Sequence, residues 1–197
     1  LIKRVATVTA REILAAGAEW AFAPALAVAR NVCWGRTFES YSEDAQTVTA
    51  CATAFVQGLQ AGLGASSVIA CARHWVGDGG TSHGIDQGDT TLAKSDLESI
   101  HIRPYRRAIE AGVFTVMASS NSWNGDKCHG HRHLLTEVLK NEMRFNGFIV
   151  SDRDGIDYLS EDYHNAVALG VNAGIDMFMV PENWKEFIER LKLHVKR

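Results

Sequence analysis

The sequence has few cysteines and no long apolar run, and each absence excludes a class of protein. Its four cysteines, Cys33, Cys51, Cys71 and Cys128, include no CxxC pair, so the usual spacing of a zinc site is missing. No apolar stretch is long enough to cross a bilayer as a helix. Lysine and arginine are scattered, and the net charge is -3, which argues against a nucleic-acid partner. We therefore expect no metal site, no membrane span and no nucleic-acid partner.

The start of the sequence shows no recognisable targeting signal. It begins at Leu1 without an initiator methionine, its first residues already have a helical pattern, and no signal peptide is visible. The sequence itself therefore leaves the compartment open. With 46% hydrophobic residues among 197, the chain is long enough for one domain with a sizeable core.

What the sequence does contain is an alternation of short apolar segments with amphipathic helical patterns. The apolar segments are residues 19–24, 68–73, 114–119, 147–152 and 174–180. Their nearly continuous apolar character is typical of parallel strands that are buried on both faces. The helical patterns between them predict crossover connections. No GxGxxG motif follows a strand, which argues against a dinucleotide-binding fold.

Polar side chains follow the predicted strands at the points where the strands end. They are His74, Asp78, Ser119, Ser120 and Asp152. In a barrel of alternating strands and helices these positions line the C-terminal face, where the chemistry occurs. We therefore predict an α/β fold, a partial (β/α)8 TIM-type barrel. Only about five of the eight units are visible, so we expect residues 1–197 to form an incomplete barrel with exposed apolar strand edges.

Asp152 is the first candidate for chemistry, because it directly ends an apolar strand. A carboxylate at the tip of a strand could attack an anomeric carbon or hold a cation. It could equally cap a turn, which is a common use of aspartate after a strand. Position alone leaves both interpretations open.

Two cationic segments are further candidates. Arg73 and His74 end the second predicted strand and supply fixed hydrogen-bond donors, which sugar hydroxyls and phosphates both require. In residues 34–44 aromatic side chains alternate with charged ones. The aromatic faces could pack on sugar rings, or the segment could be a partly buried loop in which Arg36 pairs with Glu39 or Glu43.

Five long motifs occur in one order along nearly the whole chain. They are WGRTFESYSED, ARHWVGDGGTSHGIDQGDT, VMASSNSWNG, GFIVSDRDGID and NAGIDMFMVP. In this order they resemble the N-terminal barrel domain of glycoside hydrolase family 3, the family of β-glucosidases and exo-β-glucanases. Several long motifs in one order are much more specific than any one of them.

The resemblance implies an enzyme and assigns roles to five residues. Asp152 matches the catalytic nucleophile, Arg36, Arg73 and His74 match residues that bind the sugar, and Met117 matches a residue lining its pocket. The implied reaction is retaining hydrolysis of terminal non-reducing β-D-glucosyl residues from β-glucosides or β-glucan oligosaccharides. It requires no cofactor.

Three positions depart from the family pattern. Arg73 stands where lysine is usual, Ser120 where an aromatic residue is common, and Arg153 where tryptophan usually follows the nucleophile. Arginine and lysine are not equivalent at such a site. The departures concern the stacking of the leaving group and leave the nucleophile in place.

The resemblance also implies parts that this sequence does not contain. The general acid/base glutamate usually comes from a following C-terminal domain, and an early sugar-binding aspartate would precede Leu1. We therefore expect the chain to be inactive alone, with that domain and a β-glucoside or β-glucan as partners. The alternatives are a β-N-acetylhexosaminidase of the same family, or a degenerate non-catalytic sugar-binding barrel. The family favours a periplasmic or secreted location.

Overall fold

The structure is a computed structural model, and it describes residues 1–62, 64 and 66–195 of the chain. Its main sheet has four parallel strands in the order β1-β2-β4-β7. These strands are Trp20–Ala21, Ile69–Trp75, Thr115–Ala118 and Phe148–Val150. Each strand lies beside the next one along the chain, as in an arc of a (β/α) barrel. The predicted α/β class with a parallel sheet is confirmed.

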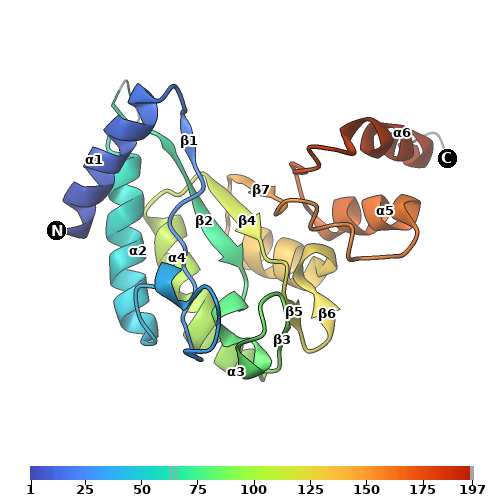
Figure 1. The fold of residues 1–197 in the computed structure, drawn as a ribbon, viewed down its shortest axis with the longest axis horizontal. Helices are drawn as coiled ribbons and strands as arrows, with labels where there is room; N and C mark the ends of the chain where they lie inside the picture. Colours follow the sequence, from blue (N-terminus) through green and yellow to red (C-terminus); the bar gives the residue numbers. More distant parts are fainter. Residues whose placement is uncertain (63, 65, 196–197) are drawn as a thin grey trace.

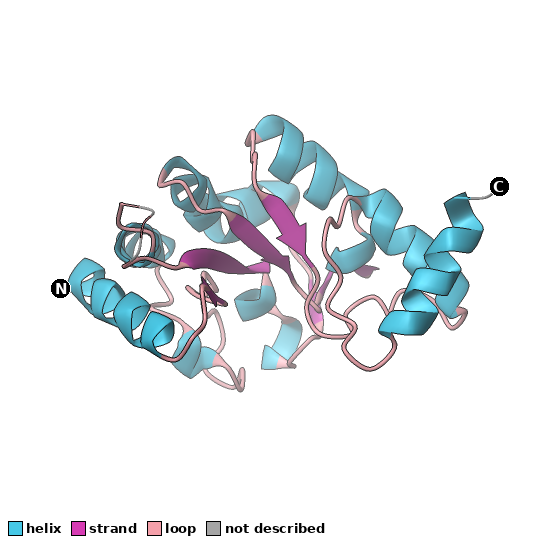
Figure 2. Ribbon diagram, turned by 90° about the horizontal axis from the view of Figure 1, so that it is seen from above, coloured by secondary structure: helices cyan, strands magenta, loops and turns pink. Residues whose placement is uncertain are grey.

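Helices connect the strands and cover the sheet (Figures 1 and 2). The longer ones are α1 Ile2–Ala15, α2 Ala45–Leu59, α4 Arg103–Glu110, the π-helix η6 His133–Glu142, α5 Tyr163–Ala173 and α6 Trp184–Val195. The short ones are η1 Thr37–Glu39, η2 Asp78–Gly80, η3 Ser82–Gly84, α3 Lys94–Asp96, η4 Leu97–Ile102 and η5 Cys128–Gly130. Helix α2 begins after Asp44, whose carboxylate accepts the Thr47 backbone N–H at 2.8 Å.

A second sheet of three short strands lies beyond the ends of β2 and β4 (Figure 1). Its strands are β3 Asp89–Thr90, β5 Ser122–Trp123 and β6 Asp126–Lys127. Asn121 ties it to the main sheet, because its amide donates to Thr90 Oγ1 at 3.1 Å and to the Val76 carbonyl at 3.3 Å. This sheet therefore fixes the loops that follow β2 and β4.

Alternate residues of the main strands point to opposite faces of the sheet. Ala70, Ala72, Val116, Ala118 and Ile149 belong to the large core, which the helices share. The residues between them form a separate small cluster on the other face. We call this cluster the inner layer: Cys71, Met117 and Val150, each at most 1% exposed.

The prediction of a fifth strand at residues 174–180 was wrong. The segment runs parallel to β7 but forms only an isolated bridge, between Met177 and Val150. Side chains take the hydrogen bonds that a ladder would use: the Asp176 carboxylate accepts Ile149 N–H at 2.8 Å, and Ser151 Oγ accepts Met179 N–H at 2.7 Å. The pairing therefore stops after one residue.

Apolar side chains are partly exposed near both edges of the main sheet. Phe22, which follows β1, is 40% exposed, and Met177 beside β7 is 46% exposed. The apolar side chains of β1 and β7 themselves are buried or half-buried, so exposed apolar strand edges stay a prediction. Among the described residues, no helix combines the length and apolar character needed to cross a membrane.

Candidate active site

Several candidate residues lie at the ends of the main strands, just beyond the inner layer. Arg73, Ser119 and Asp152 each stand two residues after a member of the inner layer. Because side chains two apart in a strand share a face, Ser119 and Asp152 are directed to one side, one layer above the apolar cluster. The register of β2 shifts between Ala72 and Trp75, and there His74, next to Arg73, faces the same side as Ser119 and Asp152. The sheet therefore gathers polar groups at the C-terminal ends of its strands.

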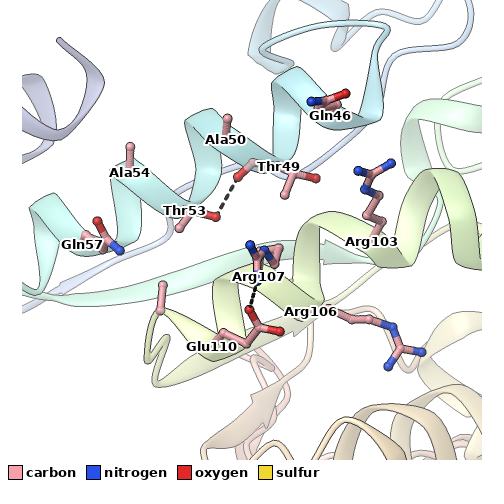
Figure 3. A pocket seen from close by; sticks show the side chains of 11 residues that line it. Gln46, Thr49, Ala50, Thr53, Ala54, Gln57, Arg103, Arg106, Arg107 and Glu110 are labelled. Atoms are coloured by element: carbon pink, nitrogen blue, oxygen red, sulfur yellow. Dashed lines mark hydrogen bonds and ion pairs between the residues drawn. The ribbon is translucent and has the colours of Figure 1, made fainter.

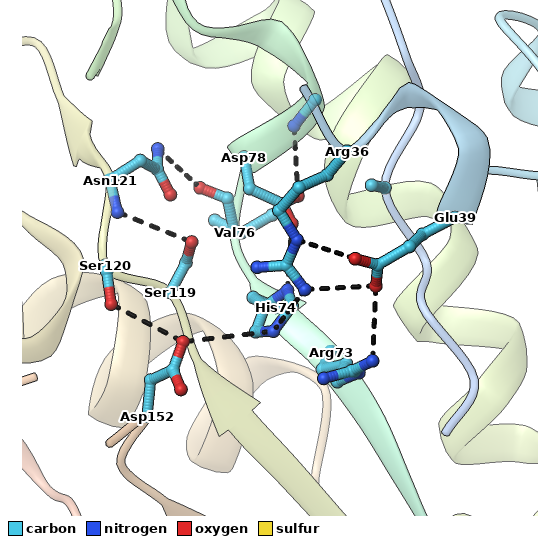
Figure 4. A network of polar contacts seen from close by, with 12 residues as sticks. Arg36, Glu39, Arg73, His74, Val76, Asp78, Ser119, Ser120, Asn121 and Asp152 are labelled. Atoms are coloured by element: carbon cyan, nitrogen blue, oxygen red, sulfur yellow. Dashed lines mark hydrogen bonds and ion pairs between the residues drawn. The ribbon is translucent and has the colours of Figure 1, made fainter. Parts of the chain in front are cut away.

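His74 connects the groups of this site (Figure 4). Its Nδ1 lies 3.0 Å from Asp78 Oδ2, and its Nε2 lies 3.4 Å from an Arg36 guanidinium nitrogen and 3.9 Å from Asp152 Oδ2. When Nδ1–H donates to Asp78, Nε2 is free to accept from Arg36. Asp78 therefore fixes which way the buried imidazole faces.

Glu39 holds the two arginines. Arg36 donates from Nε and Nη2 at 2.9 and 3.0 Å, and Arg73 donates to the same carboxylate at 3.2 Å. The hydrogen bond from Arg36, with the charges of both arginines, keeps the pKa of Glu39 below its usual value against the effect of burial. Burial alone would lower the pKa of Arg36, but Glu39 and nearby carboxylates raise it overall. Of the two partners that the sequence allowed for Arg36, the structure selects Glu39, and Glu43 is exposed.

The Asp152 carboxylate faces the same space. Its Oδ1 accepts the Arg153 backbone N–H at 2.8 Å, and its Oδ2 lies 3.5 Å from Ser120 Oγ. Its side chain is 28% exposed, so it can be reached from solvent. The turn-capping contact to Arg153 uses one oxygen and leaves the other directed to His74 and Ser120.

The structure brings three of the five predicted site residues to one cavity. The cavity is lined by Arg36, His74, Asp78, Asp86, Gln87, Ser119, Ser120, Asn121 and Asp152. Its volume is about 20 Å³, close to the space of one water molecule. As the described residues shape it, the cavity is too small to hold a sugar ring. Arg73 does not line the cavity, but Glu39 links it to Arg36, which does.

Met117 does not reach this cavity. It is 1% exposed and packs with Cys71 and Val150 in the inner layer. It stands two residues before Ser119 on the same face, so it lies one layer below the polar groups.

The departures from the family pattern take different places. Ser120 lines the cavity beside Asp152, and its small side chain leaves that wall open. Arg153 points outward instead: its side chain is 63% exposed and pairs with Glu182 and Asp154. The Arg153 guanidinium is thus directed away from the Asp152 carboxylate.

The sequence placed Asp78 at the C-terminal face of the predicted barrel, but it assigned neither Asp78 nor Glu39 a role in the site. Glu39 had a usable signal, because it stands three residues after Arg36 and was one of two possible partners. Asp78 stands four residues after His74, but the separation across a turn gave no reason to select it over the other loop carboxylates.

A larger hollow, of about 730 Å³, lies between α2 and α4 and carries Arg103, Arg106 and Arg107 (Figure 3). It is on the helical layer, away from the strand ends, and contains no candidate residue. Among residues 1–62, 64 and 66–195, no group of three or more His, Cys, Asp or Glu could hold a metal ion.

Comparison with known proteins agrees with this geometry. The family model for the glycosyl hydrolase family 3 N-terminal domain matches residues 1–197. The chain belongs to glycosyl hydrolase family 3. A solved exo-1,3/1,4-β-glucanase from a Pseudoalteromonas species is 46% identical over 99% of this chain, with a TM-score of 0.92. A β-glucosidase of Listeria innocua in complex with glucose is 26% identical over 99% of the chain, with a TM-score of 0.94.

Curated relatives in family 3 include enzymes named for different sugars. A β-xylosidase of Formosa agariphila is 37% identical over 91% of this chain, and a periplasmic β-glucosidase of Salmonella typhimurium is 28% identical over 96%. The chain spans 27% and 26% of these two relatives, and 25% of the Pseudoalteromonas exo-glucanase. It is therefore a glycoside hydrolase domain, and these relatives are about four times as long as this chain.

Proposed function

We propose that this chain supplies the nucleophile and part of the sugar-binding wall of a retaining β-glucosidase or exo-β-glucanase. The substrate would be a terminal non-reducing β-D-glucosyl residue of a β-glucoside or β-glucan oligosaccharide. Asp152 attacks the anomeric carbon and forms a covalent glycosyl-enzyme, which water then hydrolyses. The 46% identity to an exo-1,3/1,4-β-glucanase supports this substrate class.

One observation carries the proposal. The Asp152 carboxylate stands at the C-terminal end of β7, and one oxygen is directed into the cavity that Arg36 and His74 also line. A reachable carboxylate beside fixed donors is the arrangement that attack on a bound sugar requires. A capping aspartate would need only its contact to the Arg153 backbone.

The other predicted residues would hold the sugar. Arg36 lines the cavity and would donate to hydroxyl groups of the ring, and Arg73 would do so from its edge. His74 would bind a hydroxyl group through Nε2 as an acceptor. Met117 would form the apolar floor beneath them. No cofactor takes part, because nucleophile, donors and an acid are sufficient for this reaction.

The general acid/base would come from outside these residues. Glu39 is the carboxylate nearest to the arginines, but their hydrogen bonds hold its pKa low, which makes it a poor proton donor. We propose that the chain is the N-terminal part of a longer protein, and that a glutamate of a following domain completes the barrel site. The chain alone would then be inactive.

A β-xylosidase is the second candidate, because one relative with that name is 37% identical. A xyloside lacks the hydroxymethyl group of a glucoside, so the two activities separate on matched aryl substrates. We expect the longer protein to have the higher kcat/KM on the aryl β-glucoside. A higher value on the xyloside would favour the second candidate.

Replacement of Asp152 tests the mechanism. In the longer protein, Asp152→Asn keeps the size of the side chain and removes its charge, so glycosylation should slow by at least about a thousandfold. In Asp152→Gly, azide should enter the vacated space and give a glycosyl azide of inverted configuration from an aryl glucoside. Product analysis and steady-state rates measure both effects.

Asp154→Gly is the matched control. It removes a carboxylate two residues away that pairs with Arg153 and is not among the residues lining the cavity, and its φ of 51° suits glycine. This variant should keep its turnover and give no azide product. Near-normal turnover of Asp152→Asn, together with no azide product from Asp152→Gly, would contradict Asp152 as the nucleophile. The alternative of a non-catalytic sugar-binding barrel would then remain.

A further inference from the structure

The backbone N–H groups of the turn after β7 have one unusual member. Ser151 and Asp154 donate to the Met177 and Met179 carbonyls, each at 2.9 Å, and Gly155 donates to the Asp152 carbonyl at 3.1 Å. The Asp152 N–H instead donates to a side chain of another element, His129 Nε2, at 2.9 Å. The peptide that carries the carboxylate is therefore held by an imidazole.

Packing holds the His129 ring at this contact, because its Nδ1 has no hydrogen-bond partner among the described residues. It lies in η5, is 0% exposed, and follows Cys128, whose own N–H donates to the Asn121 carbonyl at 3.1 Å. Gly155 lies against the same ring: a Cβ there would be 2.3 Å from His129 Nε2. The turn after β7 thus approaches the ring at the one position where it has no side chain.

The ring also has the protonation state that the contact needs. Burial lowers the pKa of His129 to about 4, although the Asp152 charge acts in the opposite direction. His74 and Lys127 add to the lowering. At neutral pH the ring is uncharged, and Nε2 can accept only if the proton is on Nδ1.

From this geometry we infer that His129 is a positioning residue, which orients the Asp152 carboxylate by fixing its backbone N–H. The inference rests on the proposed nucleophilic role of Asp152. His129 does not line the cavity, so it acts on the reaction only through Asp152. Displacement of a reacting group by about 1 Å can cost about a hundredfold in rate.

The kinetic test uses an activated 2-deoxy-2-fluoro-β-glucoside, which forms the covalent intermediate and releases it slowly. In the longer protein, His129→Leu removes the acceptor and should lower the rate constant of inactivation about a hundredfold, with less than about a threefold change in the inhibition constant. His129→Gln can place its amide oxygen where Nε2 was and should recover at least a tenth of the wild-type rate constant. This split and this rescue separate positioning from a general loss of stability.

His101 provides the matched control. It is also buried, at 2% exposure, and lies against Gly80 as His129 lies against Gly155, but its Nε2 has no hydrogen-bond partner among the described residues. His101→Leu should leave the inactivation rate constant within about threefold of wild type. If the wild-type protein is labelled at Asp152 and the His129→Leu variant is labelled equally fast, the inference about His129 is overturned. The proposed function would remain intact in that case.

A measurement on the wild-type protein covers the case in which His129→Leu does not fold. In histidine-labelled protein, nitrogen chemical shifts should identify His129 as the Nδ1–H form with an unprotonated Nε2. A protonated Nε2 would overturn the inference, because that nitrogen could not accept the Asp152 N–H. Absence of any label on wild-type Asp152 would instead overturn the proposed function, and the positioning of a nucleophile with it.

Discussion

Glu39 joins the two arginines of the candidate site. Its carboxylate takes two hydrogen bonds from Arg36 and one from Arg73. Both arginines are long, flexible side chains, so an unanchored guanidinium would lose conformational freedom when it bound a sugar. Glu39 fixes both in advance, at the edge of the cavity.

We predict that Glu39→Gln weakens substrate binding more than it slows turnover. The amide keeps the size but loses the charge that holds both guanidinium groups, so KM for an aryl β-glucoside should rise about tenfold. The exposed Glu43 supplies the control, because Glu43→Gln should leave KM unchanged. Equal KM values for the two variants would contradict the anchoring role.

At the level of helices and strands, the hydrophobic pattern predicted the four strands of the main sheet. It wrongly predicted that residues 174–180 would add a fifth strand. Strands β1, β4 and β7 fall within the predicted segments, and β2 overlaps its segment but ends two residues later, at Trp75. Buried apolar runs are a local signal, so the pattern located all four strands. The segment after α5 has the same apolar pattern, yet Asp176 and Ser151 replace its ladder. Such side-chain contacts depend on tertiary placement, which the pattern does not contain.

The site was predictable to a similar degree. Asp152 follows β7 and His74 lies at the end of β2, so position and motif both indicated them, and the motif added Arg36. His129 belongs to no strand and contacts a backbone group 23 residues away. Neither its spacing nor its residue type indicates that contact, so only the fold reveals it.

The contact between α1 and α2 gives a prediction at this scale. Gly58 of α2 lies against α1 so closely that a Cβ would be 2.4 Å from the Lys3 carbonyl oxygen and 2.5 Å from Ala6 Cβ. Gly58→Ala should lower the free energy of unfolding by about 1–3 kcal/mol, because overpacking outweighs the gain in helix propensity. Denaturant titration measures this.

Gly35 is the control for that change. A Cβ at this position would meet nothing within 4 Å, so Gly35→Ala should leave stability almost unchanged. A Gly58→Ala protein more stable than wild type would show that the helices can separate without cost.

At the scale of the whole molecule, buried histidines make folding sensitive to mild acid. Burial lowers the pKa values of His101 and His129 from 6.5 to about 4, and burial also lowers that of His131. The unfolded chain therefore binds more protons than the folded one below pH 6.5. Stability is fully present above the unfolded pKa and is lost as the pH falls towards 4.

We predict a falling melting temperature between pH 6.5 and 5, where most carboxylates remain ionised. His101→Gln removes one of the protons taken up on unfolding and should reduce this slope. A melting temperature independent of pH across that range, or a slope unchanged in His101→Gln, would contradict the buried neutral state of these rings. Calorimetry in matched buffers gives both slopes.

The most direct test of Asp152 as the nucleophile is the site of a covalent label. The longer protein is incubated with an activated 2-deoxy-2-fluoro-β-glucoside, digested, and its peptides are mapped by mass spectrometry. We predict one added sugar on the peptide that contains Asp152, with fragment ions that place it on that carboxylate. A labelled carboxylate elsewhere, with Asp152 unmodified, would contradict it.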